Sequence, residues 1–151
     1  MPLVMLAAVG VLLLDRATKL WVVRTLAPAE SLALIPGILH LTHIRNPGAA
    51  FGLFPYQRTF LVAVSAVVMV GIFYYAWRIK SPWARFGLGL LLGGAMGNFI
   101  DRILVGAVVD FIDFRIWPVF NAADAAIVVG VILAAVYLLW GAEAGKGEST
   151  P

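Results

Sequence analysis

Four long apolar segments alternate along the chain with shorter connections that are polar or mixed in character. A helix needs about 20 apolar residues to cross the roughly 30 Å hydrocarbon core of a bilayer, and each segment is close to that length. We place the segments at about residues 3–26, 59–77, 83–100 and 122–140. The pattern therefore predicts a membrane protein that is all-α in its spanning part, with four transmembrane helices.

The connections between these segments differ in a way that indicates topology. The short connection at residues 78–85 contains Arg78, Lys80 and Arg85 without an acidic residue, so the positive-inside rule places it in the cytoplasm. Both termini then lie on the cytoplasmic side, and the two longer connections share the outer face. These mix Leu, Ile and Phe with Pro and Gly, as short strands joined by turns do. We expect a small sheet at the outer membrane surface, within a single integral membrane domain over residues 1–151 whose tail, 141–151, is disordered.

Composition supports this fold class and narrows the chemistry. The 151 residues are 62% hydrophobic and 13% charged, outside the range of soluble globular domains. The net charge of +3 comes from scattered basic residues, which does not suggest nucleic-acid binding. The chain has no cysteine, which excludes disulfides, thiol nucleophiles and thiolate metal sites.

Two charged residues in the first segment, Asp15 and Lys19, are spaced i, i+4 and share one helix face. Ionisable residues in a membrane helix are costly and usually face the interior of a helix bundle. We interpret the pair first as a structural brace near a site and second as a direct participant in chemistry.

The third segment combines small and polar residues. Glycines recur every four residues and form a smooth stripe for close helix packing or for a bound peptide, at Gly89, Gly93 and Gly97. Asn98, Asp101 and Arg102 follow at i, i+3 and i+4, so all three are expected to point the same way at the outer end of this helix. Asp101 and Arg102 are also candidates for a local ion pair.

Two further acidic positions follow the third segment. In an extended strand through VVDFIDF, residues 108–114, Asp110 and Asp113 point to opposite faces, so only one of them can face a given cavity. Asn121 lies near the cap of the fourth segment, and Asp124 lies in its first turn, where the helix dipole favours a carboxylate. A capped helix start is the plainer interpretation of Asp124.

Asp110 and Asp124 can also converge at the outer membrane surface. Two carboxylates held close together cannot both ionise readily and so share one proton. One can then act as a base on water while the other donates to a carbonyl oxygen, as in aspartic proteases. The pair titrates as a unit, so the pattern alone does not assign the two roles.

Other polar residues give weaker signals. His40 and His43 form an H-x-x-H pattern in an extended loop without the helical frame of a zinc site. Ser65 lies in an apolar helix without a base at catalytic spacing. We therefore expect no metal site and no serine nucleophile. Hydrolysis by a pair of carboxylates needs no organic cofactor, so we expect none.

Five short motifs, in order, resemble the lipoprotein signal peptidase (signal peptidase II) family: DRATK, NPGAAF, GGAMGNFIDR, VVDFIDF and FNAAD. The resemblance extends from about residue 15 to residue 124. It implies a membrane aspartyl endopeptidase that removes the signal peptide of bacterial prolipoproteins just before the diacylglyceryl-modified cysteine. The fold that it implies is four transmembrane helices plus a small extracytoplasmic β-cradle.

The resemblance also implies roles for individual residues. Asp110 and Asp124 correspond to the catalytic pair, and Gly48 to Phe51 belong to an outer cradle over the site. Supporting or substrate-binding positions are Asp15, Lys19, Asn46, Gly48, Asn98, Arg102 and Asn121. The implied location is the bacterial cytoplasmic (inner) membrane with the active site near the outer face. The expected partners are diacylglyceryl-modified prolipoprotein signal peptides and membrane lipid, and the chain is expected to act as a monomer.

Two other functions fit some of these features. Membrane aspartates and an Asp–Lys pair also occur in proton-coupled transporters, although transporter sites tend to lie near the bilayer midplane between broken helices. A membrane scaffold would explain the glycines but would leave the two aspartates without a purpose.

Overall fold

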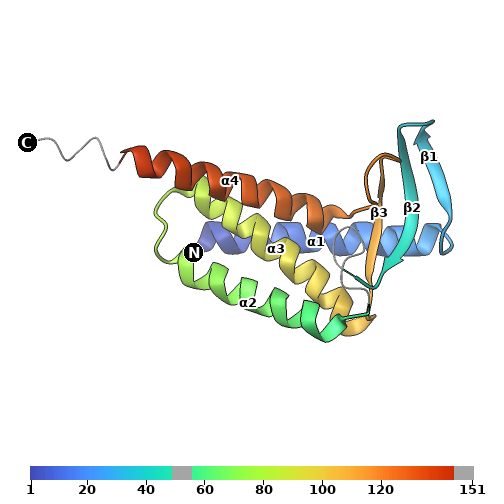
Figure 1. Cartoon of the computed structure of the whole chain (residues 1–151), viewed down its shortest axis with the longest axis horizontal. Helices are drawn as coiled ribbons and strands as arrows, with labels where there is room; N and C mark the ends of the chain where they lie inside the picture. Colours follow the sequence, from blue (N-terminus) through green and yellow to red (C-terminus); the bar gives the residue numbers. More distant parts are fainter. Residues whose placement is uncertain (49–55, 145–151) are drawn as a thin grey trace, which may run out of the picture.

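The computed structural model describes residues 1–48 and 56–144, and in this part of the chain four long helices pack together with a small sheet across one end (Figure 1). The helices are α1 (Pro2–Thr25), α2 (Arg58–Ala76), α3 (Pro82–Leu104) and α4 (Ala122–Ala144). Each predicted segment is therefore helical, and the start of each lies within one residue of the expected position. Helix α4 continues through Ala144, so residues 141–144 are helical and not disordered as expected. The rest of the predicted tail lies outside the described residues.

Helix α3 lies at the centre of the bundle and contacts the other three helices. Its glycine stripe faces α1: a Cβ atom at Gly93 would lie 2.5 Å from the backbone oxygen of Ala8. A second glycine face meets α4, where a Cβ at Gly94 would lie 2.5 Å from the backbone oxygen of Ala123. Such close approach of backbones is what small residues provide in membrane bundles, so the helix-packing interpretation of the stripe is confirmed.

The sheet contains the strands β1 (Ser31–Ile35), β2 (Leu39–Asn46) and β3 (Val108–Asp113), antiparallel and in that order. This confirms the expected small β element. Strand β3 lies nearest to the helices in Figure 1 and packs on the end of α1 through a cluster of Val22, Leu26, Val109 and Phe111. In the register, Asp110 lies opposite Ile44. The sheet therefore holds Asp110 directly against the helical bundle.

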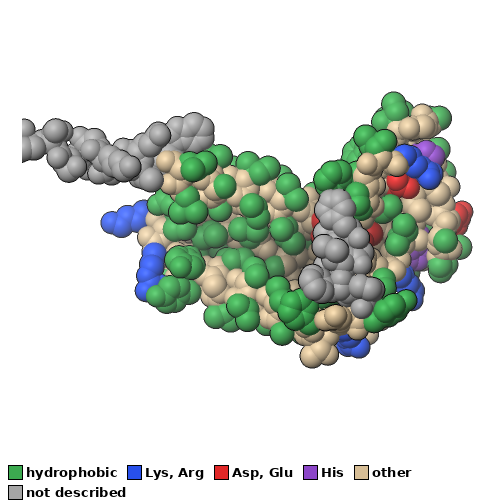
Figure 2. All heavy atoms as spheres, in the orientation of Figure 1, with side chains coloured by type: hydrophobic (Ala, Val, Ile, Leu, Met, Phe, Trp, Pro, Cys, Tyr) green, Lys and Arg blue, Asp and Glu red, His purple; other side chains and the backbone are tan. Residues whose placement is uncertain are grey.

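The two ends of the bundle differ. Figure 1 shows the N-terminus, the α2–α3 connection and the C-terminal end of α4 at one end, and the sheet at the other. Hydrophobic side chains cover much of the helical surface between these ends (Figure 2). Among the described residues, α2 and α4 are long and apolar enough to cross a membrane. Helix α1 carries Asp15, Arg16 and Lys19 within its span, so its composition alone does not identify it as membrane-spanning.

Candidate active site

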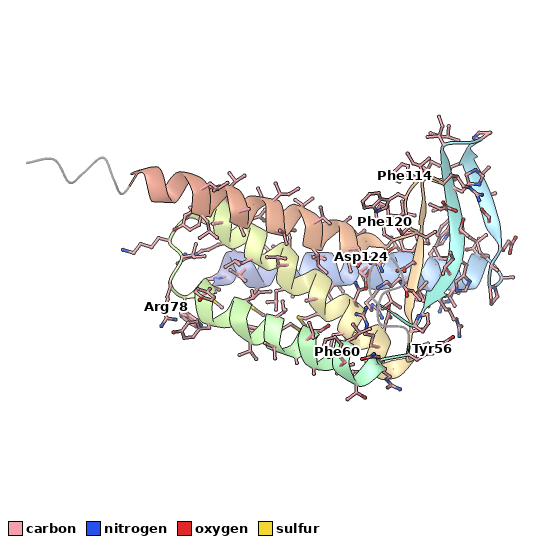
Figure 3. All side chains as sticks on the ribbon, in the orientation of Figure 1. Tyr56, Phe60, Arg78, Phe114, Phe120 and Asp124 are labelled. Atoms are coloured by element: carbon pink, nitrogen blue, oxygen red, sulfur yellow. The ribbon has the colours of Figure 1, made fainter. Side chains whose placement is uncertain are left out.

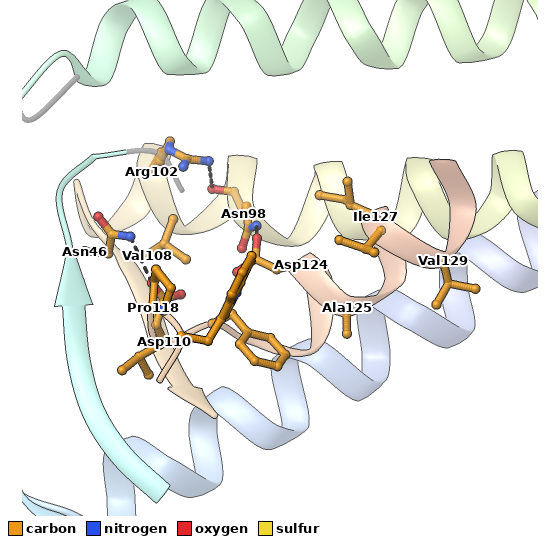
Figure 4. A pocket seen from close by; sticks show the side chains of 14 residues that line it. Asn46, Asn98, Arg102, Val108, Asp110, Pro118, Asp124, Ala125, Ile127 and Val129 are labelled. Atoms are coloured by element: carbon orange, nitrogen blue, oxygen red, sulfur yellow. Dashed lines mark hydrogen bonds between the residues drawn. The ribbon is translucent and has the colours of Figure 1, made fainter. Parts of the chain in front are cut away.

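A cavity of about 550 Å³ lies where the sheet meets α3 and α4. Figure 2 shows the surface hollowed between the helices and the sheet, with acidic side chains inside. The polar end is formed by five side chains, those of Asn46, Asn98, Arg102, Asp110 and Asp124. The remaining wall is apolar and runs along α4 past Ala125, Ile127 and Val129 (Figure 4). The cavity thus has a polar end and an apolar wall.

Two aspartates from different elements line the polar end. Asp110 projects from β3 and is 3% exposed, and Asp124 lies in the first turn of α4. The carboxylate of Asp110 accepts hydrogen bonds from Asn46 Nδ2 at 3.0 Å and Asn121 Nδ2 at 2.7 Å. The carboxylate of Asp124 accepts from Asn98 Nδ2 at 2.8 Å and from the backbone N–H of Asn121 at 3.2 Å. Asn121 therefore links the two carboxylates directly.

The amide of Asn98 has a defined orientation. Lys19 Nζ, which can only donate, lies 2.9 Å from Asn98 Oδ1, so the amide nitrogen of Asn98 must face Asp124. The same logic orients Asn121, whose Oδ1 accepts from the backbone N–H of Asp124 at 2.9 Å. Its Nδ2 is then left to donate to Asp110 and to Asn98 Oδ1. The asparagines thus present fixed donors to both carboxylates.

Asn46 is held by a local turn. Its Oδ1 accepts from the backbone N–H of Gly48 at 2.9 Å, an Asx turn that points Nδ2 towards Asp110. Arg102 approaches from α3 and donates to the backbone oxygen of Gly48 at 3.1 Å. Arg102 therefore fixes the segment after β2 at the rim of the cavity. The rest of the expected outer cradle, through Phe51, lies outside the described residues.

The environment of Asp110 changes its acidity. Burial disfavours the charged form, and the nearby negative charge of Asp124 acts in the same direction. Together they outweigh the hydrogen bonds from Asn46 and Asn121 and raise the pKa of Asp110 to about 6. A carboxyl group in this state can hold a proton at a pH where ordinary aspartates are ionised.

Next to this network lies a cluster of four charged residues, of which Asp15, Lys19 and Asp101 are buried and Arg16 is half-buried. Asp15 and Lys19 form the expected i, i+4 ion pair at 2.9 Å, and Lys19 also reaches Asp101 Oδ2 at 2.8 Å. Arg16 bridges the same two acids, 2.6 Å from Asp101 and 2.9 Å from Asp15. Asp15 Oδ1 also accepts from the backbone N–H of Ala123 at 3.2 Å, next to Asp124. The expected ion pair between Asp15 and Lys19 is therefore present beside the site, and neither residue lines the cavity.

Two expectations for this cluster were wrong or incomplete. Asp101 pairs with Arg16 and Lys19 on α1 and not with its neighbour Arg102. Asn98 and Arg102 line the cavity as expected, whereas Asp101 faces α1, because the helix turns it towards the two cations. Sequence reasoning did not single out Arg16. The available signal was that Arg16 is next to Asp15 in the sequence. Its second partner, Asp101, lies far along the chain, so the pattern around Arg16 did not indicate it.

Asp113 belongs to a separate set of contacts. It accepts from Thr42 Oγ1 at 2.7 Å and from the backbone N–H of Arg115 at 2.8 Å. Asp110, in contrast, lines the cavity. The strand alternation expected for VVDFIDF is therefore confirmed.

The remaining polar candidates have other partners. His40 Nδ1 lies 2.6 Å from Arg115 Nη2, and His43 Nδ1 lies 2.9 Å from the backbone oxygen of Leu26. Ser65 donates to the backbone oxygen of Leu61 at 2.8 Å. Within residues 1–48 and 56–144, no three His, Asp or Glu side chains are grouped so that they could hold a metal ion.

Comparison with known proteins gives a consistent result. The family model described as signal peptidase (SPase) II matches residues 7–140. A protein of Pelotomaculum thermopropionicum named lipoprotein signal peptidase is 49% identical over 131 residues, which cover 85% of this chain and 86% of the relative. One of the same name from Gloeobacter violaceus is 51% identical over 132 residues, which cover 83% of this chain and 75% of the relative.

Solved structures show the same fold. A structure described as a bacterial membrane enzyme superposes with a TM-score of 0.86 at 33% identity and covers 100% of this chain and 94% of its own. A second, described in the same words, gives a TM-score of 0.81 at 37% identity, covering 92% and 94% of the two chains. The family match extends over both aspartates and the asparagine network. The chain therefore belongs to the signal peptidase II family.

Proposed function

We propose that this chain is an aspartic endopeptidase that cleaves the signal peptide from diacylglyceryl-modified bacterial prolipoproteins, on the N-terminal side of the lipidated cysteine. The relatives named lipoprotein signal peptidase support the substrate class. The observation that carries the mechanism is the convergence of Asp110 and Asp124 on one cavity, joined through Asn121. Neither a metal nor an organic cofactor takes part in the proposed reaction.

Asp110 and Asp124 act as a catalytic dyad, in which each carboxyl group gives up or takes up one proton at each step of hydrolysis. Asp124, as a carboxylate, takes a proton from water while the water oxygen bonds to the scissile carbonyl carbon. Asp110, protonated, gives its proton to the carbonyl oxygen, and a tetrahedral diol forms. The diol then returns a proton to Asp110, Asp124 protonates the amide nitrogen, and the C–N bond breaks. Both aspartates thereby regain their starting states.

The contacts of each carboxylate favour this assignment. The raised pKa of Asp110, caused by burial and by the charge of Asp124, suits the residue that holds the shared proton. Asp124 lies in the first turn of α4, where the helix dipole and the N–H of Asn121 favour a negative charge. When substrate fills the cavity, it excludes water, and the affinity of the Asp110 carboxyl group for its proton increases further.

The apolar wall suits the proposed substrate. A signal peptide is an apolar helix and the modified cysteine carries two acyl chains, so substrate must enter sideways from the bilayer. The wall along Ile127, Val128 and Val129 offers an apolar path to the dyad. Asn46 and Arg102 at the rim are placed to receive the extended backbone around the scissile bond by hydrogen bonding.

The proposed setting is the cytoplasmic membrane, crossed by all four helices, with both termini in the cytoplasm and the sheet outside. The distribution of cations supports this orientation. Arg78 lies over the ring of Tyr74, 3.7 Å from its centroid, at the end opposite the sheet (Figure 3). Lys80 follows in the α2–α3 connection, and Arg85 lies in the first turn of α3. A basic, aromatic end facing the cytoplasm is typical of membrane proteins. We propose that one chain forms the complete site.

Cleavage assays with paired peptides test this function. The purified chain in nanodiscs is given a prolipoprotein peptide with a diacylglyceryl-modified cysteine and the same peptide unmodified. We expect cleavage of the modified peptide before that cysteine, unaffected by EDTA. Equal cleavage of both peptides would refute the substrate class, and cleavage of neither would refute the peptidase assignment.

A further inference from the structure

Two segments far apart in the sequence form an exposed apolar tip at one end of the sheet. We define the apolar tip as Ile35, Ile38, Phe114, Ile116 and Trp117. Ile116 is 94% exposed, Ile38 59% and Trp117 58%. Ile38, Phe114, Ile116 and Trp117 also line a shallow notch of about 340 Å³. Contiguous exposed apolar surface of this kind marks a site of contact with an apolar partner.

The loop that carries Ile116 and Trp117 is anchored at its base. The rings of Phe114 and Phe120 stack with centroids 6.0 Å apart, and the two phenylalanines flank the loop (Figure 3). The backbone N–H of Ile116 donates to the oxygen of Phe114 at 2.8 Å. Arg115 adopts a positive φ of 66°, a left-handed turn held by its N–H donation to Asp113. These contacts hold Ile116 and Trp117 in a defined conformation.

Polar groups near the tip bond to one another. Arg115 donates to Ser31 Oγ at 3.0 Å and lies 2.6 Å from His40 Nδ1, while its Nε lies 3.7 Å from Asp113. Figure 2 shows charged and histidine side chains gathered towards the outer part of the sheet, and hydrophobic side chains along the edge that overhangs the helices. The sheet therefore has an apolar edge beside a polar surface.

The apolar tip lies close to the start of α4, which is one of the apolar helices. Trp117 lines both the notch and the main cavity, and the loop runs directly into α4. In Figure 1 the β1–β2 turn projects past the bundle on the side of α4. Helix α4 is among the helices apolar enough to cross a membrane, and its Val131 is 51% exposed. The tip thus continues the apolar surface of α4 at the level where that helix begins.

We propose that the apolar tip inserts into the headgroup and upper acyl region of the outer leaflet, and so anchors the sheet to the bilayer beside the mouth of the cavity. Continuity with the surface of α4 identifies phospholipid as the occupant. A tryptophan among aliphatic side chains at the start of a membrane helix is a composition that favours this interfacial depth. The anchor holds the sheet over the bilayer whether or not the proposed peptidase activity is correct.

Site-directed spin labelling tests the anchor, because the chain has no cysteine of its own. Ile38→Cys and Ile116→Cys are labelled in peptide-free nanodiscs that hold one chain each. Val131→Cys is the control for lipid exposure, and Ala27→Cys, in the exposed connection after α1, is the control for water. We expect the ratio of oxygen to nickel-complex collisions at Ile38→Cys and Ile116→Cys to shift from the value at Ala27→Cys towards that at Val131→Cys.

A second variant separates insertion from local burial. Ile38→Asp is combined with the label at Ile116→Cys, and we expect the collision ratio there to fall towards the Ala27→Cys value because the tip is pushed out of the lipid. Water-like ratios at both labelled tip positions in the parent chain would overturn the proposal. A shift seen only when signal peptide is added, or only when two chains share a disc, would also overturn it and would assign the tip to substrate or to a second copy.

Discussion

Lys19 Nζ lies 2.9 Å from Asn98 Oδ1, and this contact decides which end of Asn98 faces Asp124. The amine is held in turn by Asp15 at 2.9 Å and Asp101 at 2.8 Å. All three partners are acceptors, as an ammonium group requires. A buried ion cluster on α1 and α3 therefore sets the hydrogen-bonding pattern of the proposed dyad on β3 and α4.

Lys19→Met removes the cation and keeps much of the side-chain volume. We expect a loss of about 3–5 kcal/mol in unfolding free energy, because breaking a buried pair leaves charge uncompensated. We also expect kcat to fall, because Asn98 is no longer held in the orientation that donates to Asp124. Thermal unfolding and peptide cleavage measure the two effects. Wild-type kcat in a folded Lys19→Met protein would show that the orientation of Asn98 does not matter.

Arg16 contributes to the same cluster from a more exposed position, since its side chain is 33% exposed. For Arg16→Gln we expect a smaller loss of stability, about 1 kcal/mol, because solvent screens part of the interaction. Arg24→Gln, on the exposed last turn of α1, is the matched control and should leave the unfolding temperature unchanged. Equal effects of the two variants would mean that the bridge from Arg16 to Asp15 and Asp101 contributes nothing.

Gly97 lies where α1, α3 and α4 meet. A Cβ atom at this position would lie 2.5 Å from Asp15 Oδ2 and 3.3 Å from the Cβ of Ala123. We expect Gly97→Ala to destabilise the chain by about 1–3 kcal/mol through overpacking, and to lower activity by displacing Asp15. Gly71→Ala is the control, since nothing lies within 4 Å of its Cβ position, and it should not destabilise. Unfolding temperatures that fall equally for both variants would contradict the close packing at Gly97.

The raised pKa of Asp110 predicts a dependence of stability on pH. Burial and the charge of Asp124 raise it from 3.8 to about 6, so the folded state binds this proton more tightly than the unfolded state. The resulting stabilisation is complete below pH 3.8 and is lost as pH rises through 6. Asp110→Asn removes this titration, so its stability relative to the parent chain should rise between pH 4 and pH 7, by at most about 3 kcal/mol. Thermal unfolding across this range measures it, and a pH-independent difference would contradict the shift.

The hydrophobic pattern of the sequence was sufficient to predict the helices, because apolar length and glycine spacing are local properties. The same holds for Asp110 and Asp113, whose separation in a strand determines that they face different ways. The pairing of Asp101 with Arg16 was not predictable in this way. It depends on the packing of α3 against α1, which brings residues far apart in sequence within 2.6 Å.

Side-chain orientation was a second limit. Asn46, Asn98 and Asn121 were identified as supporting positions, but the sequence does not indicate which carboxylate each serves. The structure resolves this because donor-only groups, Lys19 Nζ and the backbone N–H groups of Gly48 and Asp124, fix the amide oxygens. The end of α4 was also misjudged: the helix continues to Ala144, past the expected end at about residue 140.

The central claim is that Asp110 and Asp124 together perform hydrolysis, and the most direct test is cleavage of a diacylglyceryl-modified peptide by single Asn variants. Asp113→Asn is the matched control, because it replaces an aspartate of the same strand that contacts Thr42 and Arg115 outside the cavity. We predict that Asp110→Asn and Asp124→Asn each abolish cleavage while remaining folded, and that Asp113→Asn retains most activity. Substantial cleavage by either dyad variant, or equal loss in Asp113→Asn, would contradict this assignment.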